Sequence, residues 1–300
     1  MDQATHVAVL VVVAALAASC HTSAPLPPAV VRHAAAARVV AFGDVHGDLE
    51  ATRAALRLAG AIDAADHWAG GKLVVVQTGD QLDRGDQERE ILDLFDRLVG
   101  EAAQAGGAFL PLDGNHELMN AAGDFRYVTP GGFAQFGGED GRRAAFAPGG
   151  PVAKRLAARP IYAIVGDTLF VHGGILPAHL DQGLEALDDE ARTWLRGERP
   201  GPPRALTDHE SPLWTRRYSK PDVDDPAVCA DAAAVLKRLG LRRMVVAHTV
   251  REQGMSSLCA GSIWRIDVGL ARLYGGPLQV LELRGDDARV LGAPATPTER

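Results

Sequence analysis

The sequence is poor in cysteine, in aromatic residues and in basic charge, and each shortage excludes a class of protein. Three cysteines in 300 residues are too few for a disulfide-stabilised scaffold, and they lack the paired spacing of a zinc finger. Aromatic residues make up 5% of the chain, which argues against a surface that stacks the bases of single strands. The formal net charge is −7, so we expect no nucleic-acid partner.

One apolar run stands out near the N-terminus, and it is short. Residues 7–18 are all apolar, whereas a membrane-spanning helix needs about 20 such residues. The run matches the apolar part of a secretory signal, so we predict a signal peptide over 1–20 and export to the periplasm or cell envelope. Small residues before Cys20 resemble a lipoprotein cleavage box, which makes Cys20 a candidate lipid anchor and membrane tether; an uncleaved apolar anchor is the alternative. A flexible linker over 21–37 and a disordered tail over 293–300 complete the expected termini.

The hydrophobic content of 47% and the charged content of 23% are those of an ordinary soluble globular chain. We predict one domain over 38–292, and a repeated pattern runs through it. Five short apolar runs each end in a polar residue that can bind a metal: 39–42, 73–76, 109–112, 169–171 and 244–247. Runs of this length that are bounded by glycine predict buried strands. Helical patterns over 49–58 and 88–99 lie between the first of them, and this alternation indicates an α/β sheet. Sites in such sheets form beyond the carboxyl ends of the strands.

The polar residues at these strand ends form one set of candidate metal ligands: Asp44, His46, Asp80, Asn115, His172 and His248. One such residue alone is more often a cap or a hydrogen-bonded core residue, but five matching strand ends are not independent accidents. Carboxylate, amide and imidazole groups without a thiolate suit Mn, Fe or Zn. Six ligands exceed what one tetrahedral ion needs, so we predict two ions bridged by Asp80. Ions about 3.5–4 Å apart can hold a hydroxide between them as a nucleophile.

The motifs resemble a known family. They are Gly-Asp-Val-His-Gly at 43–47, Gly-Asp-Gln-Leu-Asp-Arg-Gly at 79–85, Gly-Asn-His-Glu at 114–117, His-Gly-Gly at 172–174 and His-Thr at 248–249. This set resembles the phosphoprotein phosphatase branch of the calcineurin-like metallophosphatases. Finer matches at 83–92, 119–128, 212–216 and 264–269 resemble the Shewanella-like protein phosphatases. The resemblance implies two packed mixed β-sheets flanked by helices, an α/β/β/α sandwich, with the metals at one sheet edge.

The resemblance also implies a role for each site residue. One metal would be held by Asp44, His46 and Asp80, and the other by Asp80, Asn115, His172 and His248. His116 would be the general acid that protonates the leaving oxygen, and Asp83 would orient it and keep it cationic. Arg84 would bind phosphate oxygens, and Arg216 looks like the second phosphate-binding arginine, with its neighbour Arg217 as the alternative. Ala247 departs from the family pattern, where glycine more usually precedes this histidine.

Two further segments need an interpretation. Residues 118–160 are long and rich in glycine, which favours a cap-like insertion over the metals; an exposed connection is the alternative. Cys259 and Arg265 have the spacing of a tyrosine-phosphatase phosphate loop, but the residues around Arg265 alternate like a strand, so we reject that loop. In an exported chain, Cys229 and Cys259 are candidates to pair as a disulfide beside the strand that presents His248.

These features predict a metal-dependent phosphomonoesterase that acts on phosphoprotein side chains, Ser/Thr or Tyr, by attack of hydroxide held between the metals. The alternative enzyme is a hydrolase of dinucleoside polyphosphates that resembles the symmetrical bis(5'-nucleosyl)-tetraphosphatases. Those enzymes share the metal motifs but typically lack an intact Asp-Arg-Gly, so residues 83–85 favour the phosphatase. A non-enzymatic binding protein on a degenerate fold would have lost ligands, and none is missing here.

Overall fold

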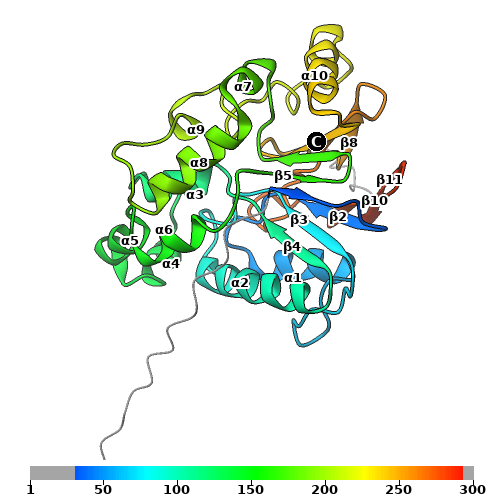
Figure 1. Cartoon of the computed structure of the whole chain (residues 1–300). Coiled ribbons are helices and arrows are strands. Elements are labelled where there is room, and N and C mark those ends of the chain that lie inside the picture. Colours follow the sequence, from blue (N-terminus) through cyan, green and yellow to red (C-terminus); the bar gives the residue numbers. More distant parts are fainter. Residues whose placement is uncertain (1–30, 293–300) are drawn as a thin grey trace, which may run out of the picture.

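The computed structural model describes residues 31–292 (Figure 1). The predicted signal peptide, Cys20, most of the predicted linker and the tail lie outside the described residues. Within residues 31–292, no helix has both the length and the apolar character needed to cross a membrane.

Two mixed β-sheets form the centre of the fold. The five-stranded sheet has the order β11-β10-β2-β3-β4, and its strands are β2 (Val39–Phe42), β3 (Val74–Gln77), β4 (Ala108–Pro111), β10 (Gln279–Arg284) and β11 (Asp287–Gly292). The six-stranded sheet has the order β1-β5-β6-β7-β9-β8, and its strands are β1 (Arg32–His33), β5 (Tyr162–Val165), β6 (Thr168–Val171), β7 (Arg243–Val246), β8 (Ser256–Leu258) and β9 (Ile263–Arg265). β2, β3 and β4 are parallel to one another, and β6 is parallel to β7.

Alternating side chains of β2 show how the layers stack. Val39 and Ala41 belong to a core that both sheets line, together with residues such as Val245 of β7. Val40 and Phe42 point the other way, into a second core between the five-stranded sheet and its helices. A third core covers the outer face of the six-stranded sheet. The predicted α/β/β/α sandwich is therefore confirmed.

Helices cover both outer faces of the sandwich. α1 (Leu49–Leu58) and α2 (Glu88–Gln104) pack on the five-stranded sheet, below the sheets in Figure 1. The remaining helices pack around the six-stranded sheet: α3 (Asn115–Ala121), α4 (Pro130–Ala134), α5 (Gly138–Phe146), α6 (Pro151–Leu156), α7 (Pro177–Gln182), α8 (Leu184–Leu195), α9 (Arg204–Thr207) and α10 (Pro226–Leu239). Local sequence signals set several ends: the Asp48 carboxylate caps α1 by accepting from the Ala51 N–H, and Gly240 ends α10 in the left-handed region.

One prediction about the chain needs correction, and one alternative is excluded. The predicted flexible linker ends too late, because Arg32 and His33 form an edge strand whose neighbouring carbonyls accept from the β5 backbone. Pairing with β5 satisfies the backbone there, which a proline-rich composition does not reveal. The insertion 118–160 is helical through α4, α5 and α6, and Phe146 and Leu156 are buried in the core, so it is not an exposed connection.

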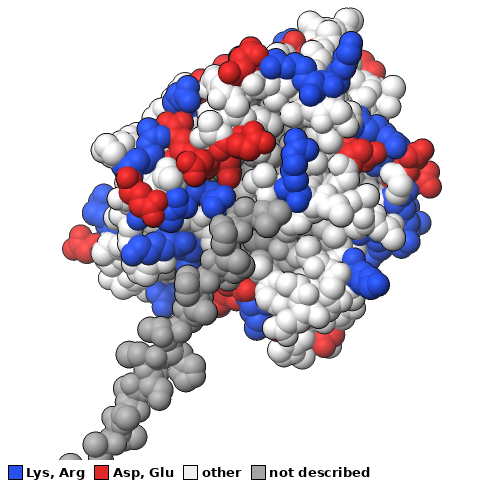
Figure 2. Space-filling model, viewed as in Figure 1, with Lys and Arg blue, Asp and Glu red and all other residues white. Residues whose placement is uncertain are grey.

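Basic and acidic side chains lie side by side over much of the face that Figure 2 shows. Ion pairs also join neighbouring helices: Arg155 of α6 pairs with Asp93 and Asp96 of α2. Pairs near the surface contribute little to stability.

Candidate metal centre and active site

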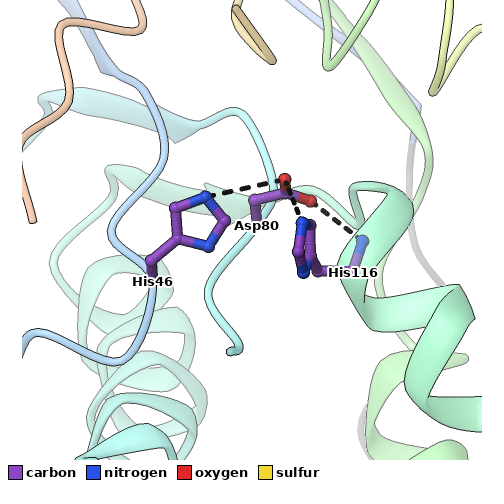
Figure 3. A group of neighbouring side chains, drawn as sticks. All are labelled: His46, Asp80 and His116. Atoms are coloured by element: carbon purple, nitrogen blue, oxygen red, sulfur yellow. Dashed lines mark hydrogen bonds and ion pairs between the residues drawn. The ribbon is translucent and has the colours of Figure 1, made fainter. Parts of the chain in front are cut away.

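The loops that follow β2, β3, β4, β6 and β7 meet at one edge of the sandwich, and Asp80 lies at their centre. Its Oδ2 atom is 3.2 Å from His172 Nε2, 3.9 Å from His46 Nε2 and 3.7 Å from His116 Nε2. Figure 3 shows the two imidazoles of His46 and His116 on opposite sides of this carboxylate. All four side chains are buried.

The other predicted ligands complete two groups around Asp80. On one side, Asp44 Oδ2 lies 3.8 Å from His46 Nε2. On the other, His172 Nε2 lies 2.9 Å from Asn115 Oδ1 and 3.1 Å from His248 Nδ1. The structure thus brings all six predicted ligands together, in two groups that share one carboxylate.

The histidines present the nitrogen that a metal would need. His46 Nδ1 lies 2.9 Å from the Leu82 carbonyl and His172 Nδ1 lies 2.9 Å from the Thr78 carbonyl. A carbonyl only accepts, so each Nδ1 carries a proton, and Nε2 is the nitrogen that faces Asp80 and is placed to bind a metal. Burial lowers the pKa of His46 to about 3, which keeps this imidazole neutral.

Two buried atoms in the centre have no hydrogen-bond partner among the residues described: Asp44 Oδ1 and His248 Nε2. Leaving such atoms unpaired in the interior is costly. Burial and the charges of Asp267 and Asp80 also raise the pKa of the Asp44 carboxyl well above its usual value. Cations between these groups would satisfy the atoms and relieve the repulsion, so the donor set fits metal ions.

The site loops hold a concentration of backbone strain. Five non-glycine site residues have positive φ: His46, Asp80, Asp83, Arg84 and His248. This conformation is uncommon for residues with a side chain, and such strain clusters at functional sites. Ala247, the departure from the family pattern, is not among the positive-φ residues of the described chain, so alanine fits its turn.

Sequence reasoning assigned no role to two carboxylates that the structure places at the site. Glu117 accepts backbone N–H groups of Asp80 at 2.9 Å, Gln81 at 2.8 Å and Gly114 at 2.7 Å, so it ties two ligand loops together. Asp267 lies beside Asp44, and burial raises its pKa to about 6. Both carboxylates lie within motifs of the sequence: Glu117 ends Gly-Asn-His-Glu at 114–117, and Asp267 lies in the match at 264–269. Their presence in these motifs could have pointed to a role at the site.

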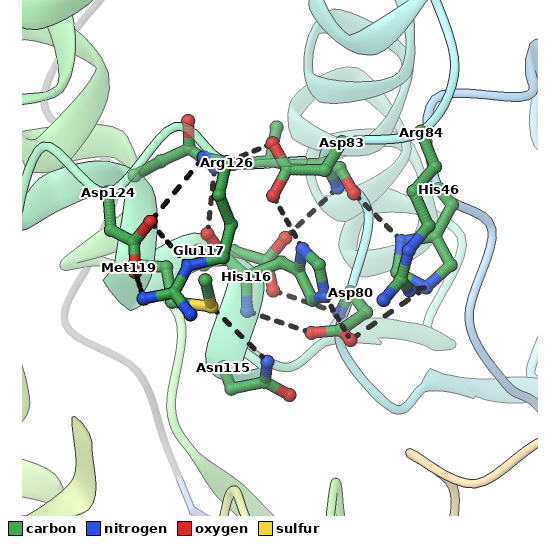
Figure 4. A network of polar contacts seen from close by, with 12 residues as sticks. His46, Asp80, Asp83, Arg84, Asn115, His116, Glu117, Met119, Asp124 and Arg126 are labelled. Carbon is green, nitrogen blue, oxygen red and sulfur yellow. Dashed lines mark hydrogen bonds and ion pairs between the residues drawn. The ribbon is translucent and has the colours of Figure 1, made fainter. Parts of the chain in front are cut away.

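His116 and Asp83 form a buried pair beside the ligands. His116 Nδ1 lies 2.5 Å from Asp83 Oδ2 (Figure 4). The Asn120 amide donates to Asp83 Oδ1 at 2.9 Å. The second ring nitrogen of His116 faces Asp80, so one nitrogen is held by a carboxylate and the other points into the site. This is the arrangement expected of an oriented general acid.

Arg84 lies at the mouth of the site between two half-exposed tyrosines. Its guanidinium carbon is 4.9 Å from the centre of the Tyr127 ring and 5.7 Å from that of Tyr274. The backbone N–H of Arg84 also donates to the Tyr127 carbonyl at 2.9 Å, so the insertion lines this side of the site. A cavity of about 510 Å³ adjoins Arg84 and His46 and reaches the exposed Leu273.

The two candidates for the second arginine differ in their surroundings. Arg217 donates to Asp231 at 2.9 Å, which directs it away toward α10. Arg216 is exposed, and its charge contributes, after burial and His172, to lowering the pKa of His248 to about 2. The ion pair of Arg217 with Asp231 and the influence of the Arg216 charge on His248 favour Arg216 over Arg217 as the second phosphate-binding arginine.

The cysteines form a disulfide, as the sequence suggested. Cys229 of α10 is bonded to Cys259, and the Cα atoms are 5.3 Å apart. Cys259 lies in the tight turn between the antiparallel strands β8 and β9, and Arg265 is buried against Ser256 Oγ at 2.8 Å. The segment is thus a hairpin without a phosphate-binding helix, which agrees with our rejection of the tyrosine-phosphatase loop.

Comparisons with known proteins agree with this geometry. The family model described as calcineurin-like phosphoesterase matches residues 37–252. Shewanella-like protein phosphatase 2 of Arabidopsis thaliana is 37% identical over 296 residues, covering 83% of this chain and 75% of that protein. Shewanella-like protein phosphatase 1 of Plasmodium berghei is 29% identical over 253 residues, covering 80% of this chain and 69% of that protein.

Solved structures share the fold. A cold-active protein-tyrosine phosphatase of a psychrophilic Shewanella species superposes with a TM-score of 0.74 at 22% identity, covering 88% of this chain and 83% of that one. A protein serine/threonine phosphatase of Saccharomyces cerevisiae superposes with a TM-score of 0.60 at 18% identity, covering 90% and 86%. At these identities the likeness concerns the fold alone.

Proposed function

Because the chain belongs to the calcineurin-like phosphoesterases and, within them, to the Shewanella-like protein phosphatases, we propose that its six converging ligands hold two metal ions. The family and the His/Asp cluster make the protein a metal-dependent protein phosphatase, a hydrolase of phosphoric monoesters. The single observation that carries the proposal of two ions is Asp80, whose carboxylate faces both ligand groups. When bound, the ions would neutralise phosphate charge and activate the attacking water; Mn, Fe and Zn all suit the donors.

The chain's own residues would then bind the phosphoryl group and supply a proton. Arg84, which contacts His46, and Arg216, whose charge acts on His248, would take the non-bridging phosphate oxygens, for which a guanidinium fork is suited. His116 would donate the proton on Nε2 to the leaving oxygen, because its Nδ1–H is held by Asp83. Asp83 would stabilise the imidazolium before the transfer and fix the ring afterwards.

For the side chain that carries the phosphate, we propose phosphotyrosine. Tyr127 and Tyr274 leave 41% and 39% of their surfaces exposed beside Arg84, so an aromatic ring that follows the phosphate has two rings to pack against. The cavity beside Arg84 would accommodate the residues that flank the phosphotyrosine, from a phosphorylated protein or peptide.

A matched peptide panel tests this proposal. One peptide sequence carrying phosphotyrosine, phosphoserine or phosphothreonine is assayed with protein stripped of metal and then reloaded with Mn, Fe or Zn; diadenosine tetraphosphate is included as the alternative substrate. We expect no turnover without metal, and about tenfold faster turnover of phosphotyrosine, since an aromatic contact of about 1.4 kcal/mol corresponds to a factor of ten. Y127A/Y274A should lose this preference while Y127F/Y274F keeps it. Equal rates on the three peptides would contradict the tyrosine proposal, and metal-independent turnover would contradict the metal site.

We also propose that the protein is exported and that a lipid on Cys20 tethers it to the membrane. The apolar run 7–18 supports export, and so does a pair of cysteines placed for a disulfide, which persists in oxidising compartments.

A further inference from the structure

Arg142 of α5 is an arginine with no exposed surface, in the insertion that sequence analysis interpreted as a cap. Three phenylalanine rings surround its guanidinium carbon, with centres at 4.7 Å (Phe146), 5.2 Å (Phe136) and 5.9 Å (Phe125). Taking a charge out of water is costly, and apolar residues of similar volume usually serve a core as well or better. Packing alone therefore does not explain why an arginine occupies this position.

The guanidinium nitrogens are engaged with one polar network. Arg142 pairs with both carboxylate oxygens of Glu88, donates to Asn120 Oδ1 at 2.8 Å and to the Gly132 carbonyl at 3.1 Å, and approaches Asp83 Oδ1 at 3.4 Å. Only a guanidinium has donors enough, in a rigid fork, to serve these partners together.

Apart from the Gly132 carbonyl, each partner of Arg142 is either Asp83 itself or a residue that is hydrogen-bonded to Asp83. Glu88 accepts the Asp83 backbone N–H at 2.6 Å, and Asn120 donates to Asp83 Oδ1 and to the His116 carbonyl at 2.9 Å each. Asp83 Oδ2 is left for His116 Nδ1. The backbone N–H and both carboxylate oxygens of Asp83 are thus held, although its φ of +68° is a strained conformation that needs such support.

We propose that Arg142 is a positioning residue for catalysis: through Glu88 and Asn120 it holds Asp83 at the angle that orients His116 toward the leaving oxygen. The helix α5 then belongs to the catalytic machinery, as a brace behind the acid instead of a cover over the metals. This inference rests on the proposed role of His116 as general acid. Misplacing a catalytic group by about 1 Å can cost about 100-fold in rate. Loss of a buried residue that fixes Asp83 should therefore lower kcat measurably.

The test is R142K, which keeps the charge but cannot reach Glu88, Asn120 and Asp83 at once. Rates are measured on a series of substituted phenyl phosphates whose leaving phenols become weaker acids than 4-nitrophenol. Weakly acidic phenols depend on proton donation and 4-nitrophenol scarcely does. We expect kcat to fall by about 10–100-fold on phenyl phosphate and by less than about threefold on 4-nitrophenyl phosphate, with KM unchanged, so that the dependence on leaving-group acidity becomes steeper.

A matched control separates this effect from loss of structure. Arg243 of β7 is also buried, but it donates to the Gly285 and Asp286 carbonyls, away from the network of Asp83. R243K should lower the rates on all phenyl phosphates by one common factor, if at all. If R142K does not fold, E88Q replaces it, because it keeps the shape of the anchor and weakens the hold on Arg142; the same steeper dependence is expected.

The variant H116N separates the proposed role of Arg142 from the proposed role of His116. A steeper dependence in H116N with an unchanged one in folded R142K or E88Q overturns the role of Arg142 and leaves the acid assignment intact. An unchanged dependence in H116N itself overturns the acid assignment and with it the basis of this inference. Equal losses on all phenyl phosphates in R142K, matching those of R243K, would reduce Arg142 to a structural residue.

Discussion

At the scale of single residues, the site depends on close approach between backbone and ligand. A Cβ atom added at Gly114 would lie 2.2 Å from Asp80 Oδ1 and 2.7 Å from the Asp80 nitrogen, far inside contact distance. Asp80 cannot move away easily, since its backbone N–H is held by Glu117 and its Oδ1 accepts the His116 N–H at 3.0 Å. The absence of a side chain at position 114 is therefore a requirement of the proposed bridging carboxylate.

G114A is expected to displace Asp80 and with it the proposed metal site. Bound metal, measured by elemental analysis, should fall, and kcat should drop by about 100-fold or more, as for other displacements of about 1 Å. G100A in α2 is the control, because a Cβ there meets nothing within 4 Å. It should keep full metal content and activity and stabilise the fold by about 0.5–1 kcal/mol, since alanine is the better helix former. Full metal content and activity in G114A would contradict the tight packing of this loop.

At the scale of elements, a buried carboxylate of the five-stranded sheet is paired with three arginines, two of them largely exposed. Glu282 of β10 is 1% exposed and accepts from Arg38 and Arg289 at 2.5 Å each, with Arg284 at 3.3 Å. Burial acts to raise the pKa of Glu282, but the three arginines outweigh it and lower this pKa to about 2. The carboxylate thus stays charged where an unfolded glutamate, with a pKa of about 4.3, begins to protonate.

The sign of the resulting pH dependence follows from linkage. A group whose folded pKa is lowered stabilises the fold fully above its unfolded pKa, and this contribution is lost as the pH falls from about 4.3 toward 2. In urea titrations between pH 6 and pH 3, the free energy of unfolding should fall less steeply for E282Q than for the wild type. E139Q, which alters an exposed ion pair with Arg143, should follow the wild-type curve. Parallel curves for E282Q and the wild type would contradict the lowered pKa.

At the scale of the whole molecule, the disulfide joins the outer helix α10 to the β8–β9 hairpin. It closes a loop of 30 residues, and cross-linking a loop of this length restricts the unfolded chain by about 3–4 kcal/mol. The two elements flank β7, whose carboxyl end leads to His248. The bond therefore stabilises the side of the sandwich that presents this ligand.

C229S/C259S should lower the free energy of unfolding of oxidised protein by about 3–4 kcal/mol, measured by urea titration. A reductant should lower the stability of the wild type by a similar amount and leave the variant unchanged. The intact mass of the protein from its native host measures the oxidation state and the start of the mature chain together. We expect a chain cleaved near Cys20 that lacks the two thiol hydrogens. Two free thiols in protein from an oxidising compartment, or an uncleaved chain, would contradict the disulfide or the export proposal respectively.

Local patterns were enough to predict much of the fold. The apolar run 39–42 is β2, the helical pattern 49–58 is α1, and the pattern at 88–99 is the first part of α2, which continues to Gln104. These elements carry their own periodicity and caps, and so they can be recognised without knowing their neighbours. The predicted linker 21–37 wrongly included the strand β1, because the pairing of residues 32–33 with β5 leaves no local signal in the sequence.

The sequence by itself determined which side chains were available for metal and phosphate chemistry, since motifs at strand ends meet wherever parallel strands end at one sheet edge. Only the tertiary structure decided which groups support them. Arg142 is 54 residues from Glu88 and 59 from Asp83, and Glu117 is 37 from Asp80, so contacts between them follow no local pattern. Whether a buried arginine braces an acid depends on how helices pack, and packing is a property of the folded chain as a whole.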